Sequence, residues 1–527
     1  MGALAVFLTA LSVLGLAQSV SFFVSTTGSD TTGDGSASNP FLSVARAQQA
    51  VRNVNPNMQE DITVVIREGL YFLPQPLVFS PVDSGTNGFT IHYKAAVGDN
   101  VIIHGGVQVK GWQPLAGTNS SVWFAALPDG VQDTRQVYIN GDRMIPTNTN
   151  KGLPGKVVIT STGYTTTDPL PSFFAAQQNA ADIEFLYTGD GSSWTECRVR
   201  VQSVSRTASG VSITMQEPGF SLARNKFYGQ GVSTPVSVAN IYSLLSSATP
   251  GQYYFNSRTR VIYYVPRPQD NMPQSTVIVP HLDTLVIAQG DTSKPAISAV
   301  RFLSFENLVF SYAGWLEPNN GLGYVDGQSG FRSLPNSTAD DTTWVPVPGN
   351  LQFHTVENIT IVNCTFTHLG AVALEIDNGS QNVKVVNNTF RDVSCGGVYV
   401  GQVNDVNVTD PTRENGHVLI HNNLFDGIPV EFRDCSAVLG GFMIDTNITH
   451  NTILNTPNTG ISLGWGWSRD EAVNAGWNNI VGNFVFGSNW LLEDGGSIYV
   501  LGPQPASLMA ENYVSNQKKL FGALYTD

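Results

Sequence analysis

Short alternations of apolar and polar residues dominate the second half of the chain and recur as one repeated unit. Each unit holds an alternating strand, an Asn at a turn and a further short strand, as in Asn382-Val-Lys-Val-Val-Asn-Asn388-Thr-Phe390. The equivalent turn positions are Cys364, Asn388, Asn423, Asn451, Asn483 and Asn512, at intervals of 24, 35, 28, 32 and 29 residues. Repeats of this length predict a solenoid of stacked coils. Because a buried Asn at a tight turn can bond backbone groups of its own and neighbouring coils, we interpret the column as an internal ladder.

A second strand in each unit gives the orientation of the outer side chains. We align the units on the inward residues Leu374, Val398, Ala437, Ile461, Ile498 and Leu524. Strand alternation then turns outward Glu375, Tyr399, Val438, Ser462, Tyr499 and Tyr525, and two positions further on Asp377, Gly401, Gly440, Gly464, Leu501 and Asp527. We therefore expect one outer face with carboxylates and tyrosines, which the glycines open into a trough.

The whole pattern predicts an all-β protein, a right-handed parallel β-helix with an inserted β-sandwich domain. Residues 20–110 are expected to hold an N-terminal cap helix and the first coils, because Leu42–Arg52 has helical periodicity with Ser43 as a plausible N-cap. Residues 111–281 carry irregular strands without the ladder, which favours the inserted β-sandwich. The main β-helix follows over residues 282–527, with a long loop at 314–349. The alternative is a β-sandwich throughout, with Asn-rich turns.

Composition and charge favour an extracellular protein that binds neither nucleic acid nor strongly anionic polymers. The net charge is −14, and charged residues make up only 13% of the chain.

Residues 1–19 contain an apolar run that ends in small residues, which predicts a signal peptide and a secreted protein. This run is too short to span a bilayer, and no later run is long enough. Asn-X-Ser/Thr sequons such as that at Asn407 predict a glycoprotein. The four cysteines permit disulfides in that compartment.

Several segments resemble secreted β-helix proteins that act on carbohydrates. They include Gly105-Gly-Val-Gln-Val-Lys-Gly-Trp112, Val137-Tyr-Ile-Asn-Gly141, Gly460-Ile-Ser-Leu-Gly-Trp-Gly-Trp467 and Asp494-Gly-Gly-Ser-Ile-Tyr499. The pattern is similar to glycoside hydrolase family 141, whose described activities are α-L-fucosidase and xylanase, and it covers nearly the whole chain. The resemblance implies two catalytic acids, which fall by motif match on Asp494 and Asp527. In the family the last segment continues into further coils, so we expect this chain to be truncated at its C-terminus.

The repeat itself also brings these two acids to neighbouring coils. Glycoside hydrolysis needs two carboxyl groups ~5–5.5 Å apart in retaining enzymes or ~6.5–9.5 Å apart in inverting enzymes. Asp494 lies at the turn into one coil and Asp527 ends the strand of the next, with coils ~4.8 Å apart, so either spacing is possible. One would be the general acid and the other the base or nucleophile. Glu493 would replace Asp494 if the turn points otherwise, and Asp-Gly-Gly is also a favoured plain turn.

The remaining candidate residues are expected to bind a carbohydrate substrate. Trp465 and Trp467 can stack on a sugar face or pack internally, and Tyr499 and Tyr525 share the outer face with the acids. Glu375 and Asp377 lie further along the stack, where they either contact substrate or are surface charges. The sequence predicts no cofactor and no metal ion.

Two other functions remain open. A polysaccharide lyase of the same fold would need a basic residue to hold a uronate and remove its α-proton. The nearest basic residues, Arg433, Arg469 and His450, lie outside the outward columns. A non-catalytic glycan-binding β-helix protein would need no acid pair. We expect a hydrolase acting on a fucosyl- or xylosyl-containing polysaccharide or glycan.

Overall fold

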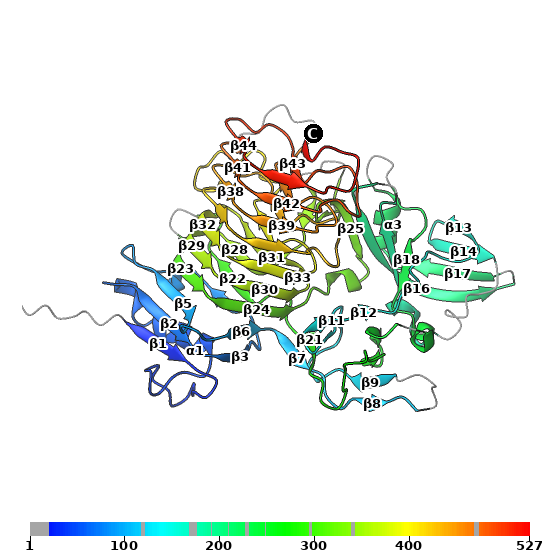
Figure 1. Cartoon of the computed structure of the whole chain (residues 1–527), viewed down its shortest axis with the longest axis horizontal. Helices are drawn as coiled ribbons and strands as arrows, with labels where there is room; N and C mark the ends of the chain where they lie inside the picture. The colour runs from blue at the N-terminus through cyan, green and yellow to red at the C-terminus, as the bar shows by residue number, and fades with distance from the viewer. Residues whose placement is uncertain are drawn as a thin grey trace, which may run out of the picture.

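The computed structural model describes residues 20–116, 122–167, 177–190, 192–208, 210–226, 231–247, 249–294, 298–338, 343–467 and 474–527. Their stacked coils form three parallel sheets around one core, so the predicted parallel β-helix is confirmed (Figure 1). The predicted signal peptide lies outside the described residues. None of the helices in the described ranges is long and apolar enough to cross a membrane.

After β1, each coil contributes one strand to each sheet, in a fixed order along the chain. Sheet 1 contains β1 (Ser21–Val24), β2 (Ile62–Ile66), β5 (Ile91–Ala95), β23 (Val300–Glu306), β29 (Val356–Val362), β32 (Gln381–Val386), β35 (Leu419–His421), β38 (Asn447–Thr449), β41 (Asn479–Val481) and β44 (Leu508–Ala510). Sheet 2 contains β3 (Gly69–Phe72), β6 (Val101–His104), β24 (Leu308–Ala313), β30 (Thr365–Leu369), β33 (Thr389–Val393), β36 (Leu424–Asp426), β39 (Thr452–Leu454), β42 (Phe484–Phe486) and β45 (Tyr513–Ser515). Sheet 3 contains β4 (Leu77–Phe79), β22 (Val286–Gln289), β28 (Gly349–His354), β31 (Val372–Asp377), β34 (Val398–Val400), β37 (Val438–Gly440), β40 (Ile461–Leu463), β43 (Ile498–Val500) and β46 (Leu524–Thr526).

The strands between the first and later coils form separate, mainly antiparallel sheets beside the stack. One contains β11 (Asp142–Arg143), β10 (Tyr138–Ile139), β21 (Val277–Pro280) and β7 (Gly106–Gln108); another contains β12 (Ile145–Pro146), β19 (Gln252–Asn256), β20 (Val261–Tyr264), β9 (Trp123–Ala126) and β8 (Gln113–Pro114). The largest contains β13 (Lys156–Thr160), β14 (Gly163–Thr167), β17 (Gly210–Met215), β16 (Glu196–Thr207), β25 (Tyr324–Gln328), β26 (Phe331–Arg332) and β27 (Val345–Pro346), with β15 (Glu184–Thr188) and β18 (Ser237–Ala239) paired to its side. A short helix, α3 (Gly219–Arg224), accompanies it.

The segment expected as a long loop at 314–349 instead contributes strands β25, β26 and β27. Strand β25 pairs with β16, so this segment joins the inserted sheets rather than standing free. The solenoid itself continues across the insertion, since β5 pairs with β23 and β6 with β24. The inserted sheets and the segment 314–349, called the late segment below, therefore join one continuous stack.

The N-terminal end of the stack is covered by a helix in the predicted place. Helix α1 (Val44–Val51) begins after Ser43, whose side chain accepts a hydrogen bond from the backbone N–H of Arg46. Its apolar face, with Val44, Ala47 and Val51, is buried in the same core as the coils. This burial protects the first coil from edge-to-edge pairing.

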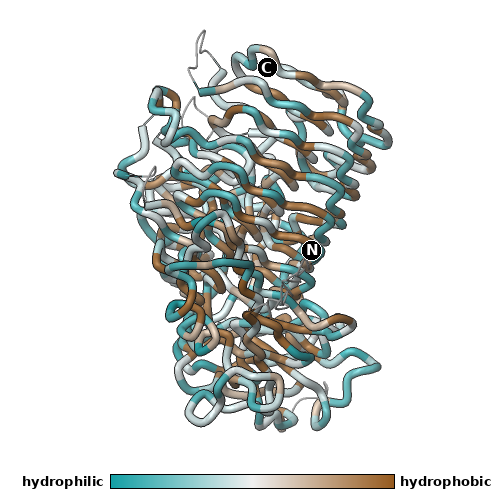
Figure 2. The backbone as a smooth tube through the Cα atoms, turned by 90° about the vertical axis from the view of Figure 1, so that its left-hand side faces the viewer, coloured by the Kyte–Doolittle hydropathy of each residue, from teal (hydrophilic) through white to brown (hydrophobic). Residues whose placement is uncertain are grey.

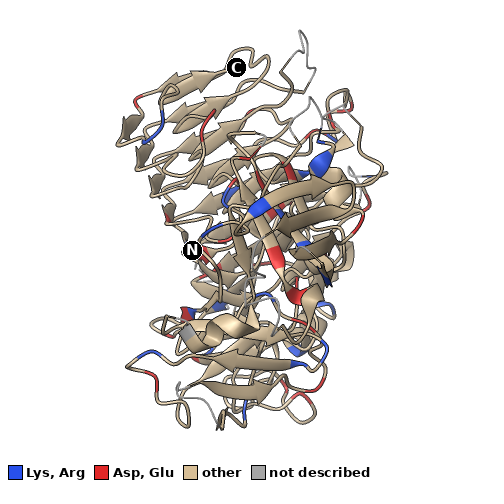
Figure 3. Cartoon of the chain, turned by 90° about the vertical axis from the view of Figure 1, so that its right-hand side faces the viewer, with Lys and Arg blue, Asp and Glu red and all other residues tan. Residues whose placement is uncertain are grey.

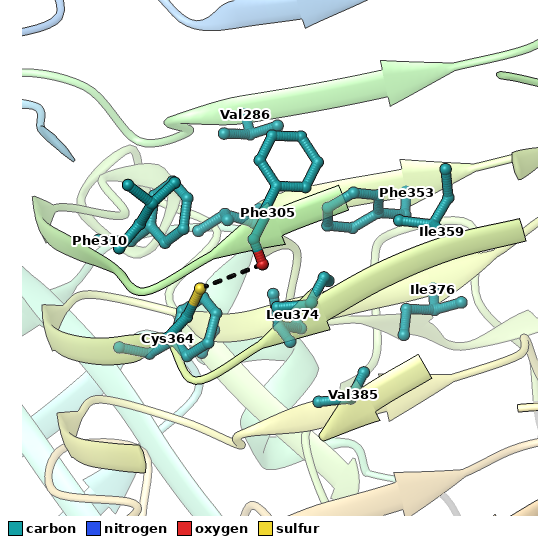
Figure 4. Close-up of a cluster of buried hydrophobic side chains, with 14 of the residues drawn as sticks. Val286, Phe305, Phe310, Phe353, Ile359, Cys364, Leu374, Ile376 and Val385 are labelled. Atoms are coloured by element: carbon teal, nitrogen blue, oxygen red, sulfur yellow. Dashed lines mark hydrogen bonds between the residues drawn. The ribbon is translucent and has the colours of Figure 1, made fainter. Parts of the chain in front are cut away.

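The core is a column of like residues, one on top of the next. Figure 2 shows hydrophobic stretches recurring at the same place in successive coils. The rings of Phe366, Phe390 and Phe425 stack with centroids 4.8 and 4.6 Å apart. At the start of the ladder the thiol of Cys364 donates to the carbonyl of Phe305, 3.5 Å away (Figure 4). Side-chain alternation in parallel strands thus produces one continuous apolar interior.

The predicted ladder is present at the turn between sheets 1 and 2. Each ladder Asn from Asn388 to Asn512 accepts, through Oδ1, the backbone N–H of the ladder residue one coil earlier, at 2.8 to 3.0 Å. The residue before several of these positions has left-handed backbone, with φ of 58° at Asn387 and 54° at Asn422. Asn tolerates that conformation better than most side chains, which explains the Asn-Asn pairs.

The alignment of sheet 3 is correct except in one unit. Val398 pairs with Val438, not with Ala437, and Val438 pairs with Ile461. The outward residues of that coil are therefore Leu439 and Gly441. The turn before β37 is several residues longer than those before β34 and β40, so the repeat did not fix the register there.

Candidate active site

The candidate acids lie together at the outer face of the last two strands of sheet 3. Strands β43 and β46 pair with Tyr499 opposite Tyr525, and their rings are 5.1 Å apart. The hydroxyl of Tyr499 donates to Oδ2 of Asp527 at 2.8 Å. The hydroxyl of Tyr525 donates to Oδ1 of Asp494 at 3.2 Å. Two tyrosines from adjacent coils thus orient two carboxyl groups, and four of the predicted site residues form one cluster.

The packing around the turn that carries Asp494 requires glycine at the two positions after it. Asp494 has a left-handed φ of 57°. A Cβ on Gly495 would lie 2.7 Å from the hydroxyl of Thr459, and one on Gly496 would lie 2.8 Å from the carbonyl of Gly522. Because neither position has room for a side chain, the turn holds Asp494 in place.

The electrostatic environment favours the protonated form of Asp494. Burial raises the pKa of Asp494, and the charge of Asp527 raises it further, while the hydrogen bond from Tyr525 lowers it. Burial and the two nearby carboxylates raise the pKa of Tyr525 to about 12, and burial also raises the pKa of Tyr499. Both phenols therefore remain protonated and donate their hydrogens to the carboxyl groups at neutral pH.

The two tryptophans of the Gly-Trp-Gly-Trp segment have different environments. Trp467 is 38% exposed, and its indole N–H donates to the hydroxyl of Tyr499 at 3.2 Å. Trp465 is only 2% exposed and packs edge-on against Trp467 at 5.5 Å. The structure therefore leaves Trp467 as the aromatic surface beside the acids, and Trp465 supports it from behind.

Glu493 points away from the candidate acids. Its carboxylate pairs with the ammonium group of Lys519 at 3.0 Å, and its backbone N–H donates to the carbonyl of Ser193 at 3.0 Å. The residue therefore links the turn to the inserted sheets, and its side chain does not share the hydrogen bonds of Asp494.

Glu375 and Asp377 are buried elsewhere on sheet 3 and do not join the site. Their exposed fractions are 6% and 1%. Glu375 accepts the backbone N–H of Gly349 at 2.7 Å, while Asp377 contacts His354 and Gln402. Burial and the charge of Asp377 raise the pKa of Glu375 to about 8. Potential ligand atoms of His354, Glu375 and Asp377 lie within 4.8 Å of one another, so the prediction of no metal ion stays a prediction.

A second buried acid pair was missed by the sequence reasoning. Asp326 on β25 and Asp434 in the turn before β37 are both fully buried, and the hydroxyl of Tyr324 donates to Asp434. Burial and the charge of Asp434 raise the pKa of Asp326. Burial, followed by the charge of Glu196, raises the pKa of Asp434 to about 7. No repeat signal could have found the pair, because Asp326 belongs to the segment outside the coils.

A cavity of about 640 Å³ separates the inserted sheets from the stack. Charged residues are sparse along the last coils and more frequent near the inserted strands (Figure 3). The arginines of the cavity are bound to protein carboxylates. Arg135 pairs with Glu184 at 2.8 Å and Glu431 at 2.9 Å, and Arg143 pairs with Asp392 at 2.6 Å. These ion pairs bridge the inserted sheets and the stack, so their first role is structural.

The described basic residues that were considered for a lyase have partners other than the acid pair. The guanidinium of Arg433 pairs with Glu196 at 2.8 Å and also donates to Thr188. The ring of His450 packs edge-on against His421 of sheet 1 at 5.4 Å. Arg469 lies outside the described residues. The two described candidates are therefore committed to other contacts.

Comparison with known proteins supports the fold. No family model matches the chain, and no curated protein matches it. A solved structure described as "Glycoside hydrolase" is similar, with a TM-score of 0.80 and 21% identity over 95% of this chain and 89% of that chain. Another, "The complex structure of XylC with xylose", has a TM-score of 0.50 and 13% identity over 94% of this chain and 65% of that chain. At these identities the similarity shows a shared β-helix architecture.

Proposed function

We propose that this protein is a glycoside hydrolase in which Asp494 and Asp527 act on one glycosidic bond. The observation that carries the proposal is the pair of carboxyl groups on adjacent coils, each held by a tyrosine hydroxyl. The shared fold with a structure described as a glycoside hydrolase supports the same class. Two carboxyl groups astride a sugar bond are the common requirement of glycoside hydrolysis.

The two acids have different roles in this proposal. Asp494, whose pKa is raised by burial and by Asp527, is the general acid that protonates the leaving oxygen. Asp527, which accepts the hydrogen bond of Tyr499, is the carboxylate that activates water or attacks the anomeric carbon. Trp467 supplies an aromatic face against which a sugar ring can pack.

The proposed substrate is a fucosyl- or xylosyl-containing polysaccharide or glycan. The acid pair and its tyrosines suit a neutral sugar, because the carboxylate of Asp527 would repel a uronate. A lyase is less well supported, since Arg433 pairs with Glu196 and His450 packs on sheet 1. A non-catalytic glycan-binding protein would need no pair of carboxyl groups on adjacent coils.

We also propose that the protein acts outside the cell. The apolar run at residues 1–19 and the sequons favour secretion. The disulfide between Cys395 and Cys435 supports an oxidising compartment, where such bonds persist.

The test is a cleavage assay on fucosylated glycans and xylans that follows new reducing ends and ultraviolet-absorbing unsaturated uronates in parallel. We expect new reducing ends without ultraviolet-absorbing product. The rate of cleavage should fall by about 10²- to 10⁴-fold in Asp494→Asn and in Asp527→Asn. Asp445→Asn is the matched control, because Asp445 is an exposed acid with left-handed backbone that pairs with His417. Unsaturated product would establish a lyase instead. Glycan binding without any product would establish a binding protein.

A further inference from the structure

The outer face of sheet 3 is covered along its middle coils by the late segment that contains β25, β26 and β27. The outward residues Tyr399 and Leu439 are 2% and 1% exposed. The hydroxyl of Tyr399 donates to the carbonyl of Ser329 at 2.6 Å, and the ring of Phe331 stacks on Tyr399 at 6.5 Å. The trough expected along the whole face is therefore filled by protein over these coils.

The covered region ends in an aromatic wall beside the acid pair. Trp465, on the turn after β40, packs against Phe331 at 4.7 Å and Trp344 at 6.0 Å. Trp467 packs on Trp465 and donates to Tyr499, which in turn donates to Asp527. The last exposed aromatic residue of the wall thus touches the site itself.

The wall is anchored and does not resemble an open lid. Tyr324 of β25 bonds Asp434 of the stack, and the backbone N–H of Gly330 donates to Asp326 at 3.0 Å. Strand β25 also pairs with β16 of the inserted sheets. A sugar chain would have to break these buried contacts to run further along the face.

The space between the wall and the acids is short. Trp465 and Trp467 follow β40, and the acids belong to the two coils after it, so the wall and the pair are one to two coil steps of ~4.8 Å apart. We propose that the site admits only the terminal sugar of a chain and releases single monosaccharides. This inference rests on the proposed hydrolase function and assigns its mode of action, with Trp467 as the residue that limits the depth of the site.

The experiment compares the earliest products from a ladder of xylo-oligosaccharides and fucosylated oligosaccharides with the viscosity of the parent polymers. We expect free monosaccharide and chains shortened by one sugar, with polymer viscosity retained while reducing ends accumulate. Early release of larger oligosaccharides that depends on Asp494 would overturn the terminal mode and leave the hydrolase intact. Cleavage that survives in Asp494→Asn, or no cleavage at all, would overturn both.

The role of Trp467 is tested by product length rather than by rate. Trp467→Ala should add space for one more sugar, so disaccharide should appear among the early products with a severalfold rise over the parent protein. Trp467→Phe should retain monosaccharide release, because it keeps the aromatic wall. Trp477→Ala is the matched control, since Trp477 is 56% exposed and precedes β41 of sheet 1. An unchanged product set in Trp467→Ala would overturn the assignment of Trp467.

Discussion

The chemistry proposed for this protein depends on the pKa of Asp494, which individual side chains around it raise or lower. Burial and the charge of Asp527 favour its protonated form, while the hydroxyl of Tyr525 favours its ionised form. The acid is therefore tuned by a neighbour from the following coil. A similar hydrogen bond from Tyr499 orients Asp527.

Replacing Tyr525 by Phe should shift the pH dependence of hydrolysis. The change removes the hydrogen bond that stabilises the ionised form, so the pKa of Asp494 rises. Since a general acid is active when protonated, the alkaline limb of kcat/KM should move to higher pH, by about one unit at most. The pH profiles of the parent and the variant measure the shift. Tyr513→Phe, on the 59% exposed tyrosine of sheet 2, should leave the limb in place, and a shift to lower pH in Tyr525→Phe would contradict the assignment.

At this scale the sequence located the acids and their tyrosines but not the neighbours that bury other candidates. Asp494, Asp527, Tyr499 and Tyr525 follow from one motif and from strand alternation. Trp465, Glu375 and Asp377 were expected near substrate, yet all three are buried. Their burial depends on contacts such as those of Trp465 with Phe331 and of Glu375 with Gly349, which join residues far apart in sequence and which no local pattern specifies.

At the scale of single elements, the Asn ladder is the device that fixes the stacking of coils. Asn423 accepts the backbone N–H of Asn388 through Oδ1 and donates through Nδ2 to the carbonyl of Val385 at 2.9 Å and to Asn451 at 2.9 Å. All of these groups are inside the stack, away from water. The Asn423 side chain therefore bonds groups of the coil before it and of the coil after it.

Asn423→Ala should destabilise the protein strongly. The change leaves a buried N–H and a buried carbonyl without partners, at about 1–3 kcal/mol each, so we expect a loss of about 2–6 kcal/mol in the free energy of unfolding. Chemical denaturation of the two proteins measures it. Asn271→Ala removes an exposed side chain that bonds Gln274, and it should cost within about 0.5 kcal/mol. Equal stability of Asn423→Ala and the parent would show that water replaces the ladder.

The elements also show where sequence reasoning reaches its limit. The ladder interval and the alternation of β-strands predicted the sheets, because each coil repeats the same buried positions. The unit containing Ala437 was misplaced by one residue, since the turn before β37 is several residues longer than those before β34 and β40. The sequence predicted a loop in place of β25 to β27 because β25 pairs with β16, which is far away in sequence, and β26 and β27 then extend that sheet.

At the scale of the whole molecule, a late segment closes the face of the stack and is fastened there by buried acids. Asp326 of the segment and Asp434 of the stack lie among Tyr324, Tyr399, Glu196 and Lys226. Burial raises the pKa of both carboxyl groups, and Lys226 lowers that of Asp326. The pair is therefore stable when it retains a proton.

The stability of the fold should fall as the pH rises. With the pKa of Asp434 raised to about 7, the folded protein binds more protons than the unfolded chain between about pH 4 and about pH 7. The unfolded state is then favoured progressively as pH rises through 7. Asp434→Asn can still accept from Tyr324 and can donate to Asp326, so it should flatten this dependence. Denaturation at pH 5 and pH 8 measures the effect, with the exposed Asp129→Asn as control. A stability that rises from pH 5 to pH 8 equally in the parent and Asp434→Asn would contradict the shared proton.

The measurement that tests the central claim most directly is the dependence of hydrolysis on the leaving group in Asp494→Asn. In a dinitrophenyl glycoside of xylose or fucose, the leaving group is dinitrophenolate, which departs without being protonated. The sugar leaving group of an oligosaccharide needs a proton from a general acid. If Asp494 is that acid, the variant should lose about 10²- to 10⁴-fold on oligosaccharides and retain near-parent rates of bond cleavage on the dinitrophenyl substrate. Equal losses on both substrates, or no loss on oligosaccharides, would contradict the role given to Asp494.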